Sequence, residues 1–491
     1  MSKTATHFNH FLPAAILVFS SLALGLSFVF EPPFSIYFGI GLAIFPAIIY
    51  LLVFNRKLFY PILVFLVPVS VSMSVGGGTK ADLPSEPLLG IMMLVVVINL
   101  LLKSGADKKF FLHPVSLLLL FELCWMVFCS INGELPLVSL KRCLVRFSFV
   151  AVFYFLFFSW ITNPLSAGKV FIIYAAGCII PIIHGMIFHS AFQFSSVAAY
   201  LMPRPFFSEH TIYGACLAFI IPMLVILVFN ARDFNLQGWR VLLLSGLTLL
   251  IIAGEFLSFS RAAWVSLAVA FVFRLLIFIR IRMWMIFLVL SFAGIFAYQN
   301  STAILETIKR NESVSNKGGI SDHLMSVTNV QSDASNLERI NRWKCAIRMA
   351  KLKPITGFGP GTYQFEYGRF QSRADLTRIS TFRGTNGHAH SEFFNAISET
   401  GIPGGIIYLA ILFSVLGYGL RVIYNAKEKQ ERIIALGALL GLVTFFVHGF
   451  FNAFLDTDKI AVLVFGSFSI IVYLDIRQRK AAEAHLKNIE A

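Results

Sequence analysis

The chain has 491 residues, of which 57% are hydrophobic and only 13% are charged, and its formal net charge is +15. A soluble domain carries about 25% charged residues, so this composition excludes an ordinary water-soluble protein and indicates a membrane protein. Much of the Lys and Arg lies in short segments between apolar runs, where it is typical of an orientation signal. We therefore expect membrane lipids as partners and no nucleic acid.

The apolar runs predict an all-α polytopic membrane protein with about 14 spans, because a span needs about 20 apolar residues. In chain order they cover residues 11–30, 34–54, 58–75, 88–102, 115–131, 147–161, 170–192, 213–229, 241–257, 262–279, 283–299, 403–420, 433–450 and 460–475. The runs at 88–102 and 147–161 are short, which gives a range of roughly 12–14 spans.

The distribution of Lys and Arg predicts the orientation. The segments 103–109, 230–240, 280–282 and 421–432 are rich in Lys or Arg, and they fall on the inner face if the N-terminus is cytoplasmic. The predicted organisation, in sequence order, is spans 1 to 11 in residues 1–299, a large periplasmic loop at 300–397, spans 12 to 14 in residues 398–475, and a cytoplasmic tail at 476–491. Both termini are thus predicted to be cytoplasmic.

Two segments of the predicted outer face carry more positive charge than orientation requires. One is the presumed loop 132–146, with Lys141, Arg142 and Arg146, and the other is the loop 300–397, with 13 Lys/Arg and 8 Asp/Glu, which gives 13 − 8 = +5. Long segments cross the membrane largely regardless of charge, so the topology stands. The charge favours an anionic ligand on this face, or else a solvated basic surface.

The large loop has three parts with different patterns. Its first third, 301–335, is rich in Ser, Asn and Gly and predicts irregular structure. Residues 337–352 place apolar side chains at helical spacing between basic ones, which predicts an amphipathic helix that carries Arg339, Arg342 and Arg348. A Gly-Phe-Gly-Pro-Gly turn at 357–361 follows.

The densest polar cluster adjoins the span that begins near Pro403. Ser391 is a candidate N-cap, so His390 is expected just before a helix N-terminus, whose dipole favours a neutral imidazole. Such an imidazole can take a proton from a hydroxyl or hydrogen-bond a phosphate. In the alternative interpretation, His388 and His390 merely satisfy turn backbone groups. Glu399 either orients this site or caps a helix.

The cluster resembles the signature of a known family. His390-Ser391, nine further residues, then Gly401-x-x-Gly404 is similar to the histidine motif of the O-antigen ligase family. A Ser-Arg-Ala-Ala-Trp string at 260–264, and the Arg-rich helix before the Gly-Phe-Gly-Pro-Gly turn, resemble blocks that ligases share with Wzy-type polysaccharide polymerases. The resemblance covers about residues 200–455.

The resemblance implies a GT-C-like glycosyltransferase of the bacterial inner membrane that acts at the periplasmic face. Its donor would be a glycan on undecaprenyl pyrophosphate, its acceptor a hydroxyl, and it would use neither metal nor cofactor. The six scattered cysteines likewise show no metal-binding spacing. The candidate catalytic residues are His390, Arg261 and Arg342, and the candidate substrate-binding residues are Arg204, Arg339, Arg348, Glu399 and His388.

Alternatives remain open at the level of the sequence. A ligase would join the polymer to a lipid A-core acceptor, which the histidine spacing favours. A polymerase for O-antigen or exopolysaccharide would join two lipid-linked repeat units, which about 14 spans favour slightly, and either enzyme would have partners in a polysaccharide assembly system. The rival of another class is a flippase or transporter, which would use ionisable residues inside spans, such as Glu255 and His448, but would also predict inverted repeats that are not evident.

Overall fold

The computed structural model describes residues 56–76, 79–102, 107–300, 334–376, 380 and 387–490. The spans predicted at 11–30 and 34–54, and almost all of the Ser/Asn-rich segment 301–335, lie outside these residues. The chain divides into two compact units, Met1–Leu63 and Val64–Ala491, and the residues of the candidate site all lie in the larger unit.

Most described residues are helical. The helices are α3 Arg56–Leu66, α4 Ser85–Leu102, α5 Lys108–Phe111, α6 Pro114–Ile131, α7 Pro136–Phe149, η2 Val150–Leu156 (a π-helix), α8 Phe157–Trp160, α9 Pro164–Ala191, α10 Ser196–Ala199, α11 His210–Phe229, α12 Trp239–Leu257, α13 Arg261–Phe278, α14 Met283–Gln299, α17 Ala334–Leu352, α18 Tyr363–Glu366, α19 Glu392–Asn425, α20 Lys429–Phe451 and α21 Asp458–Glu490. Short 3₁₀ turns occur at η1 Val67–Val69, η3 Ala231–Phe234, η4 Tyr367–Phe370 and η5 Arg373–Asp375.

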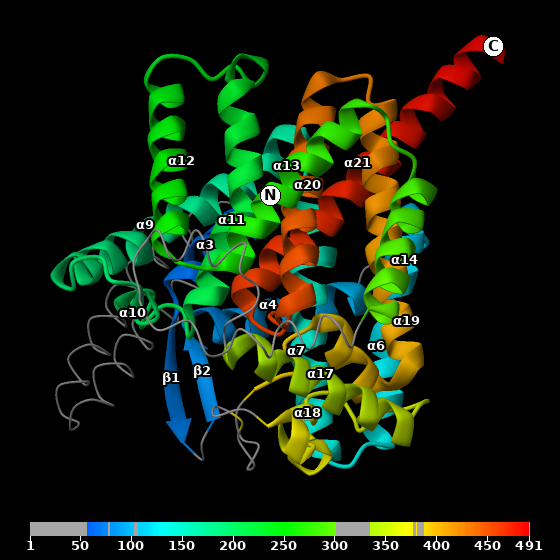
Figure 1. Cartoon of the computed structure of the whole chain (residues 1–491). Helices are drawn as coiled ribbons and strands as arrows, with labels where there is room; N and C mark the ends of the chain where they lie inside the picture. Colours follow the sequence, from blue (N-terminus) through cyan, green and yellow to red (C-terminus); the bar gives the residue numbers. More distant parts are fainter. Residues whose placement is uncertain are drawn as a thin grey trace, which may run out of the picture. The chain divides into compact units, whose positions relative to one another are not determined.

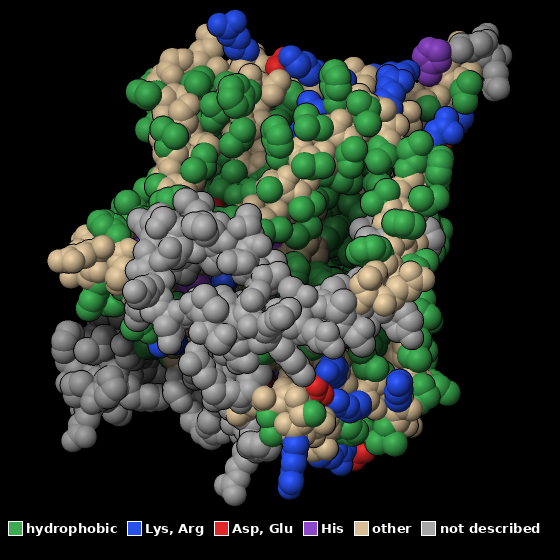
Figure 2. Space-filling view, in the orientation of Figure 1, with side chains coloured by type: hydrophobic (Ala, Val, Ile, Leu, Met, Phe, Trp, Pro, Cys, Tyr) green, Lys and Arg blue, Asp and Glu red, His purple; other side chains and the backbone are tan. Residues whose placement is uncertain are grey.

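Nine helices of the described part are long and apolar enough to cross a membrane. They are Pro114–Ile131, Pro136–Trp160, Pro164–Ala191, His210–Phe229, Trp239–Leu257, Arg261–Phe278, Glu392–Asn425, Lys429–Phe451 and Asp458–Asn488. Figure 2 shows hydrophobic side chains over much of the helical face that it presents, with Lys and Arg along the upper edge. The predicted all-α polytopic membrane fold is therefore confirmed.

The span predicted at 58–75 is helical only as far as Val69, and its last part is wrong. The helical part ends at Val69, and the chain then forms an antiparallel hairpin of β1 Val71–Gly76 and β2 Thr79–Leu83, with Val71 opposite Leu83. The reason is visible in the residues, since apolar and polar side chains alternate from 71 to 75, which is the period of a strand and not of a helix.

The outer loop predicted at 132–146 is also wrong over most of its length. Helix α7 begins at Pro136, where the missing N–H of proline costs no hydrogen bond, and it continues through the π-helix and α8 to Trp160. The cations Arg142 and Arg146 therefore project from a helix that enters the apolar layer. A helix can carry them there because their partners lie within the protein, as described below.

Helix α20 is the central helix of a group of packed helices. It contacts α11, α13, α19 and α21, while α19 also contacts α6 and α17. In Figure 1, α17 and α18 lie at the lower end, near the start of α19, and the C-terminal end of α21 projects at the upper end. The predicted helix 337–352 is confirmed as α17, and it covers the end of the bundle where α19 begins.

Candidate functional site

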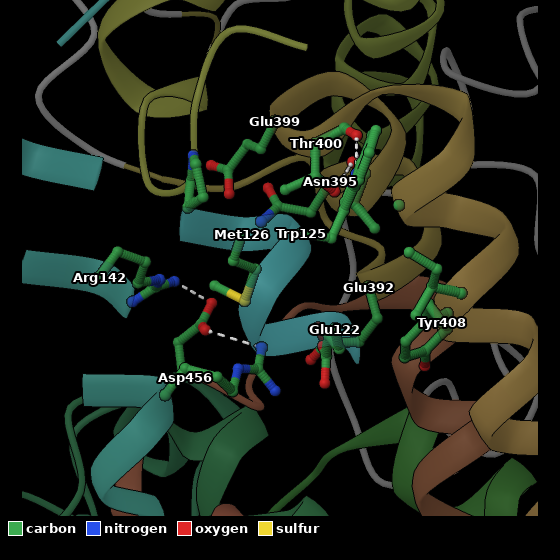
Figure 3. A pocket seen from close by; sticks show the side chains of 15 residues that line it. Glu122, Trp125, Met126, Arg142, Glu392, Asn395, Glu399, Thr400, Tyr408 and Asp456 are labelled. Carbon is green, nitrogen blue, oxygen red and sulfur yellow. Dashed lines mark hydrogen bonds and ion pairs between the residues drawn. The ribbon is translucent and has the colours of Figure 1, made fainter. Parts of the chain in front are cut away.

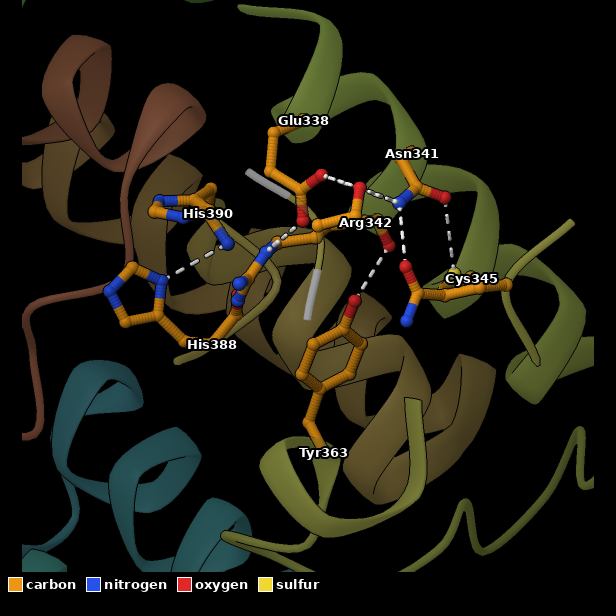
Figure 4. A network of polar contacts seen from close by, with 9 residues as sticks. Glu338, Asn341, Arg342, Cys345, Tyr363, His388 and His390 are labelled. Atoms are coloured by element: carbon orange, nitrogen blue, oxygen red, sulfur yellow. Dashed lines mark hydrogen bonds and ion pairs between the residues drawn. The ribbon is translucent and has the colours of Figure 1, made fainter. Parts of the chain in front are cut away.

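The segment 387–391, here called the histidine loop, enters α19 through an unusual backbone. His390 has a φ of +51°, and its backbone N–H donates to Nδ1 of His388 over 3.1 Å, with the ring centroids 4.6 Å apart (Figure 4). A non-glycine residue at positive φ costs about 1–3 kcal/mol, so the surroundings must impose this conformation. Ser391 is the N-cap by position, but its side chain makes no capping bond.

Helix α17 holds the histidine loop by its carbonyl groups. Nη1 of Arg342 donates to the carbonyl oxygen of His388 over 3.0 Å, and Nε1 of Trp343 donates to that of His390 over 3.2 Å. Gly387 lies against the same guanidinium with a φ of +115°, and a Cβ at this position would clash with Nη1 of Arg342. The close approach of loop and helix thus requires a glycine.

Arg342 is itself enclosed by protein groups. Its Nε donates to Oε1 of Glu338 over 3.0 Å, its guanidinium carbon lies 4.9 Å from the ring centroid of Tyr367, and only 7% of the residue is exposed. Figure 4 shows this network extending from Glu338 through Arg342 to the loop. These contacts give Arg342 a positioning role toward the histidines, while direct contact with a substrate stays a prediction.

The environment keeps both imidazoles neutral. Burial is the largest cause that lowers the pKa of His388 to about 3, followed by the guanidinium charge of Arg342. Burial is also the first cause that lowers the pKa of His390 well below its usual range, followed by His388 and Arg342. Each imidazole therefore has a free lone pair at neutral pH. Burial and nearby cations are the causes that the structure identifies, and the contribution of the helix dipole stays a prediction.

Arg339 and Arg261 border the same region from two helices. The charge of Arg339 on α17 acts on His388 and His390, and also on His210 at the start of α11. The charge of Arg261, the first residue of α13, acts on His210 as well. Residues far apart in the sequence thus place two cations around neutral imidazoles.

Comparison with known families identifies the part of the chain that carries this geometry. Residues 246–409, about a third of the chain, match the model of the O-antigen ligase family. This stretch, here called the ligase domain, is similar to the domain of that family. The resemblance of the histidine motif to the O-antigen ligase and Wzy-type superfamily is thereby confirmed. A comparison with curated proteins gives no match.

The glycines of the ligase domain form a backbone clasp. At Gly401 the chain has a φ of +72° and α19 is kinked, so the carbonyl groups that precede the kink lack helical partners. The Gly-Phe-Gly-Pro-Gly turn supplies them: the N–H of Phe358 donates to the Ser398 carbonyl over 3.1 Å, and that of Gly359 to the Glu399 carbonyl over 2.8 Å. Across the kink, the N–H of Ile402 donates to the carbonyl of Pro354 over 2.8 Å.

This clasp explains why the motif contains glycine at its contact points. A Cβ at Gly401 would clash with the carbonyl oxygen of Ile355, and one at Gly357 would lie 2.5 Å from the carbonyl oxygen of Glu399. Oε1 of Glu399 accepts a hydrogen bond from the N–H of Tyr363 over 3.1 Å. The geometry therefore connects Glu399 to the clasp, and orientation of a substrate by this residue stays a prediction.

Two other predicted arginines lie in different surroundings. Arg348 donates to Oδ2 of Asp375 and to the carbonyl of Phe370, each over 2.7 Å, and so joins α17 to the turn segments that follow it. Arg204 is exposed in the turn before α11, and no described contact joins it to the histidine loop. Substrate binding by either residue stays a prediction.

A cavity that is partly open to solvent adjoins the start of α19, between α6, α7 and α19. Asp456 pairs with Arg142 and, over 3.3 Å, with Arg146, while Glu122 and Glu392 also line the space. Figure 3 shows Arg142 and Asp456 on one side and Glu392 on the other. In this region acidic and basic side chains line the space, whereas the histidine loop presents two imidazoles beside the Arg342–Glu338 pair.

Glu392 and Asn452 are contacts of the site that were not predicted from the sequence. Oε1 of Glu392 accepts hydrogen bonds from the N–H groups of Phe454 and Leu455, over 2.6 and 2.7 Å, and so ties the start of α19 to the segment after α20. Asn452 lies in that segment beside His448. The signal available in the sequence was proximity to histidines, since Glu392 follows His390 by two residues and Asn452 follows His448 by four.

Proposed function

We propose that this protein is a membrane glycosyltransferase of the O-antigen ligase type. In the proposed reaction, a glycan moves from undecaprenyl pyrophosphate to a hydroxyl of lipid A-core. The observation that carries the proposal is the arrangement of two cations beside neutral imidazoles. Arg339 acts on both His390 and His210, and Arg261 acts on His210.

The cations suit a pyrophosphate leaving group. Guanidinium groups bind phosphate oxygens through paired N–H donors and keep their charge at any physiological pH. We assign Arg261 and Arg339 to the pyrophosphate, and Arg342 to holding the histidine loop. Because these guanidiniums would supply the charge neutralisation, we expect transfer to continue in the presence of a metal chelator.

His390 is proposed to receive the proton of the acceptor hydroxyl. Its pKa is well below the usual range without substrate, because of burial and neighbouring positive charge. A bound pyrophosphate would add negative charge, which favours the protonated imidazole and makes the ring a stronger base when the donor is present. Because the basicity of His390 would rise only when the donor is bound, proton transfer would occur only in the enzyme–donor complex.

The bonds and the proton balance without a co-reactant. The acceptor oxygen forms a bond to the anomeric carbon of the glycan as the bond from that carbon to the pyrophosphate oxygen breaks. The hydroxyl proton passes to the His390 imidazole, and then to the released lipid pyrophosphate or to water. The reaction requires charge neutralisation at the pyrophosphate, a proton acceptor and a fixed position for that acceptor, and the residues named above are proposed to supply all three.

We further propose that the site faces the periplasm from the inner membrane, with the loop 300–397 periplasmic and both termini cytoplasmic. Chain order supports this orientation. Helix α11 starts at His210 and ends before Arg232. Helix α12 would cross the membrane in the opposite direction, and α13 then starts at Arg261 and ends before Arg280. The site residues thus share one side of the membrane, and the Lys/Arg-rich segments share the other, as the positive-inside rule requires.

Deletion of the gene, followed by glycolipid analysis, tests the reaction. Accumulation of long lipid-linked polymer without surface attachment is the result expected for a ligase. Accumulation of single lipid-linked repeat units would instead identify a Wzy-type polymerase, which has the same donor chemistry. If donor fails to reach the outer face, the proposal is wrong and a flippase is indicated.

Complementation with point variants tests the site. We expect His390→Ala and Arg261→Ala each to reduce transfer by a factor of about 10²–10⁴, since each removes a group assigned to the transition state. The matched control is Lys351→Ala, which removes an exposed cation from the last turn of α17. Full transfer by both site variants, at normal membrane levels, contradicts the assignment.

A further inference from the structure

The C-terminal end of α20 presents a second buried histidine to the site. His448 is 1% exposed, and Nδ2 of Asn452, one turn later, lies 3.2 Å from its Nδ1. The backbone N–H of Asn452 also donates to the carbonyl of His448 over 3.0 Å. Both residues lie outside the part of the chain that matches the ligase family.

The segment after α20 is fixed against the histidine loop. The carboxylate of Glu392 accepts from two successive N–H groups of this segment, those of Phe454 and Leu455. The ring of Phe454 then lies between two imidazoles, with its centroid 5.4 Å from that of His448 and 6.0 Å from that of His388. Asn452 is therefore held in place by its neighbours on both sides.

The hydrogen bonds of Asn452 determine where both imidazoles carry their protons. An amide nitrogen only donates, so Nδ1 of His448 accepts, and a neutral imidazole then has its proton on Nε2. The side chain of Asn452 also lies within hydrogen-bonding reach of the His390 imidazole, whose Nδ1 has no partner among the described residues. The amide oxygen can therefore accept from Nε2–H of His390. One amide thus bridges the two rings.

Each of the two imidazoles has one ring nitrogen without a hydrogen-bond partner among the described residues. These nitrogens, Nε2 of His448 and Nδ1 of His390, are both buried. A buried donor or acceptor without a partner costs about 1–3 kcal/mol, and we take the donor Nε2–H of His448 and the acceptor Nδ1 of His390 as groups that gain their partners from a ligand. The charge of Arg339 acts on His448 as it does on His390, which places both rings in the field of one cation.

We propose that His448 and Asn452 complete the transfer site, His448 by donating its Nε2–H to a phosphoryl oxygen of the lipid-linked donor, and Asn452 by fixing the tautomer of His390. This inference rests on the proposed function. His448 is then a donor-binding residue, and Asn452 is a positioning residue that acts through His390.

The experiment measures kcat and KM for a lipid-pyrophosphate-linked glycan, with purified full-length protein, over a range of pH. We expect His448→Leu to raise the KM for donor about 10-fold or more, because a hydrogen bond to a charged group is lost. His448→Gln keeps an amide donor and is expected to restore most of the affinity. We expect Asn452→Leu to lower kcat about 10- to 100-fold with little change in KM.

Asn452→Asp provides a readout that a merely structural role would not change. A carboxylate beside both rings favours their protonated forms, so the acidic limb of the kcat/KM profile should move to higher pH. The matched control is Thr444→Val, one turn earlier in α20, where the buried hydroxyl bonds only to the Gly441 carbonyl over 2.7 Å. Its kinetic constants and pH profile should equal those of the wild type.

The outcomes separate this inference from the proposed function. If His390→Ala abolishes transfer but the donor KM of His448→Leu and the pH profile of Asn452→Asp are unchanged, the inference on the second pair is wrong and the proposed function survives. If His390→Ala is fully active, the proposed function itself fails.

Discussion

Two regions that meet at the start of α19 contain buried charge in different arrangements. In the cavity, Arg142 and Arg146 pair with Asp456, so the cations have an acid within the protein. Around the histidine loop, Arg339 instead acts on imidazoles that are held neutral. The comparison teaches that an ion pair between helix α7 and Asp456 occupies the first region, whereas imidazoles that can exchange protons occupy the second, where we propose that the reaction takes place. Variants should therefore affect stability in the first region and transfer in the second.

The largest effect on stability is expected in the cavity. Asp456→Ala would leave two arginines in partly buried positions without their shared acid, and removal of one partner of a buried ion pair costs about 3–5 kcal/mol. We expect a markedly lower melting temperature of the detergent-solubilised protein, measured by tryptophan fluorescence.

The control for Asp456→Ala is Glu483→Ala, which breaks an exposed pair with Lys109 and should leave the melting temperature unchanged. An Asp456→Ala protein that is as stable as the wild type but inactive would contradict the comparison, because it would place function in the cavity.

The backbone clasp should give the second largest effect. Gly401→Ala combines a positive φ with a clash against the Ile355 carbonyl, and we expect a loss on the order of 2–3 kcal/mol. Gly246→Ala is the control, since a Cβ at that helical position meets no atom within 4 Å. Its melting temperature should stay the same or rise slightly, because alanine favours a helix. Equal stability of Gly401→Ala and the wild type would show that the clasp contributes little.

The sequence sufficed for features that depend on local pattern. Apolar runs located most of the helices of the described part, although the start of α7 at Pro136 was missed. The spacing from His390 to Gly401 and Gly404 identified the ligase domain. The role of Arg342 did not follow, because its partners come from Glu338 and a distant carbonyl. The bridge at Asn452 did not follow either, since tautomers depend on tertiary contacts and not on spacing.

The pH dependence of stability should reflect the histidine loop. The pKa of His388 is about 3 in the folded protein and about 6.5 when unfolded, so between these values the unfolded chain binds more protons. Stability should therefore fall as the pH drops below 6.5, by at most about 1.4 kcal/mol per pH unit for this group. Melting temperatures between pH 7 and 5 measure it, and His388→Gln should reduce the slope. An identical slope in that variant would refute the assignment.

The smallest expected effect separates function from stability most directly. His390 and Arg280 both have a positive φ, of 51° and 57°, which glycine adopts without strain. Replacing either residue by glycine should therefore raise the unfolding free energy by up to about 1 kcal/mol. Only His390→Gly should abolish transfer, because Arg280 lies in the turn between α13 and α14, away from the imidazoles. A more stable but inactive His390→Gly protein would mean that the strain at this position is maintained for the reaction. Loss of stability in that variant would mean instead that the imidazole contributes to the fold, as the turn-satisfying interpretation of the sequence proposes.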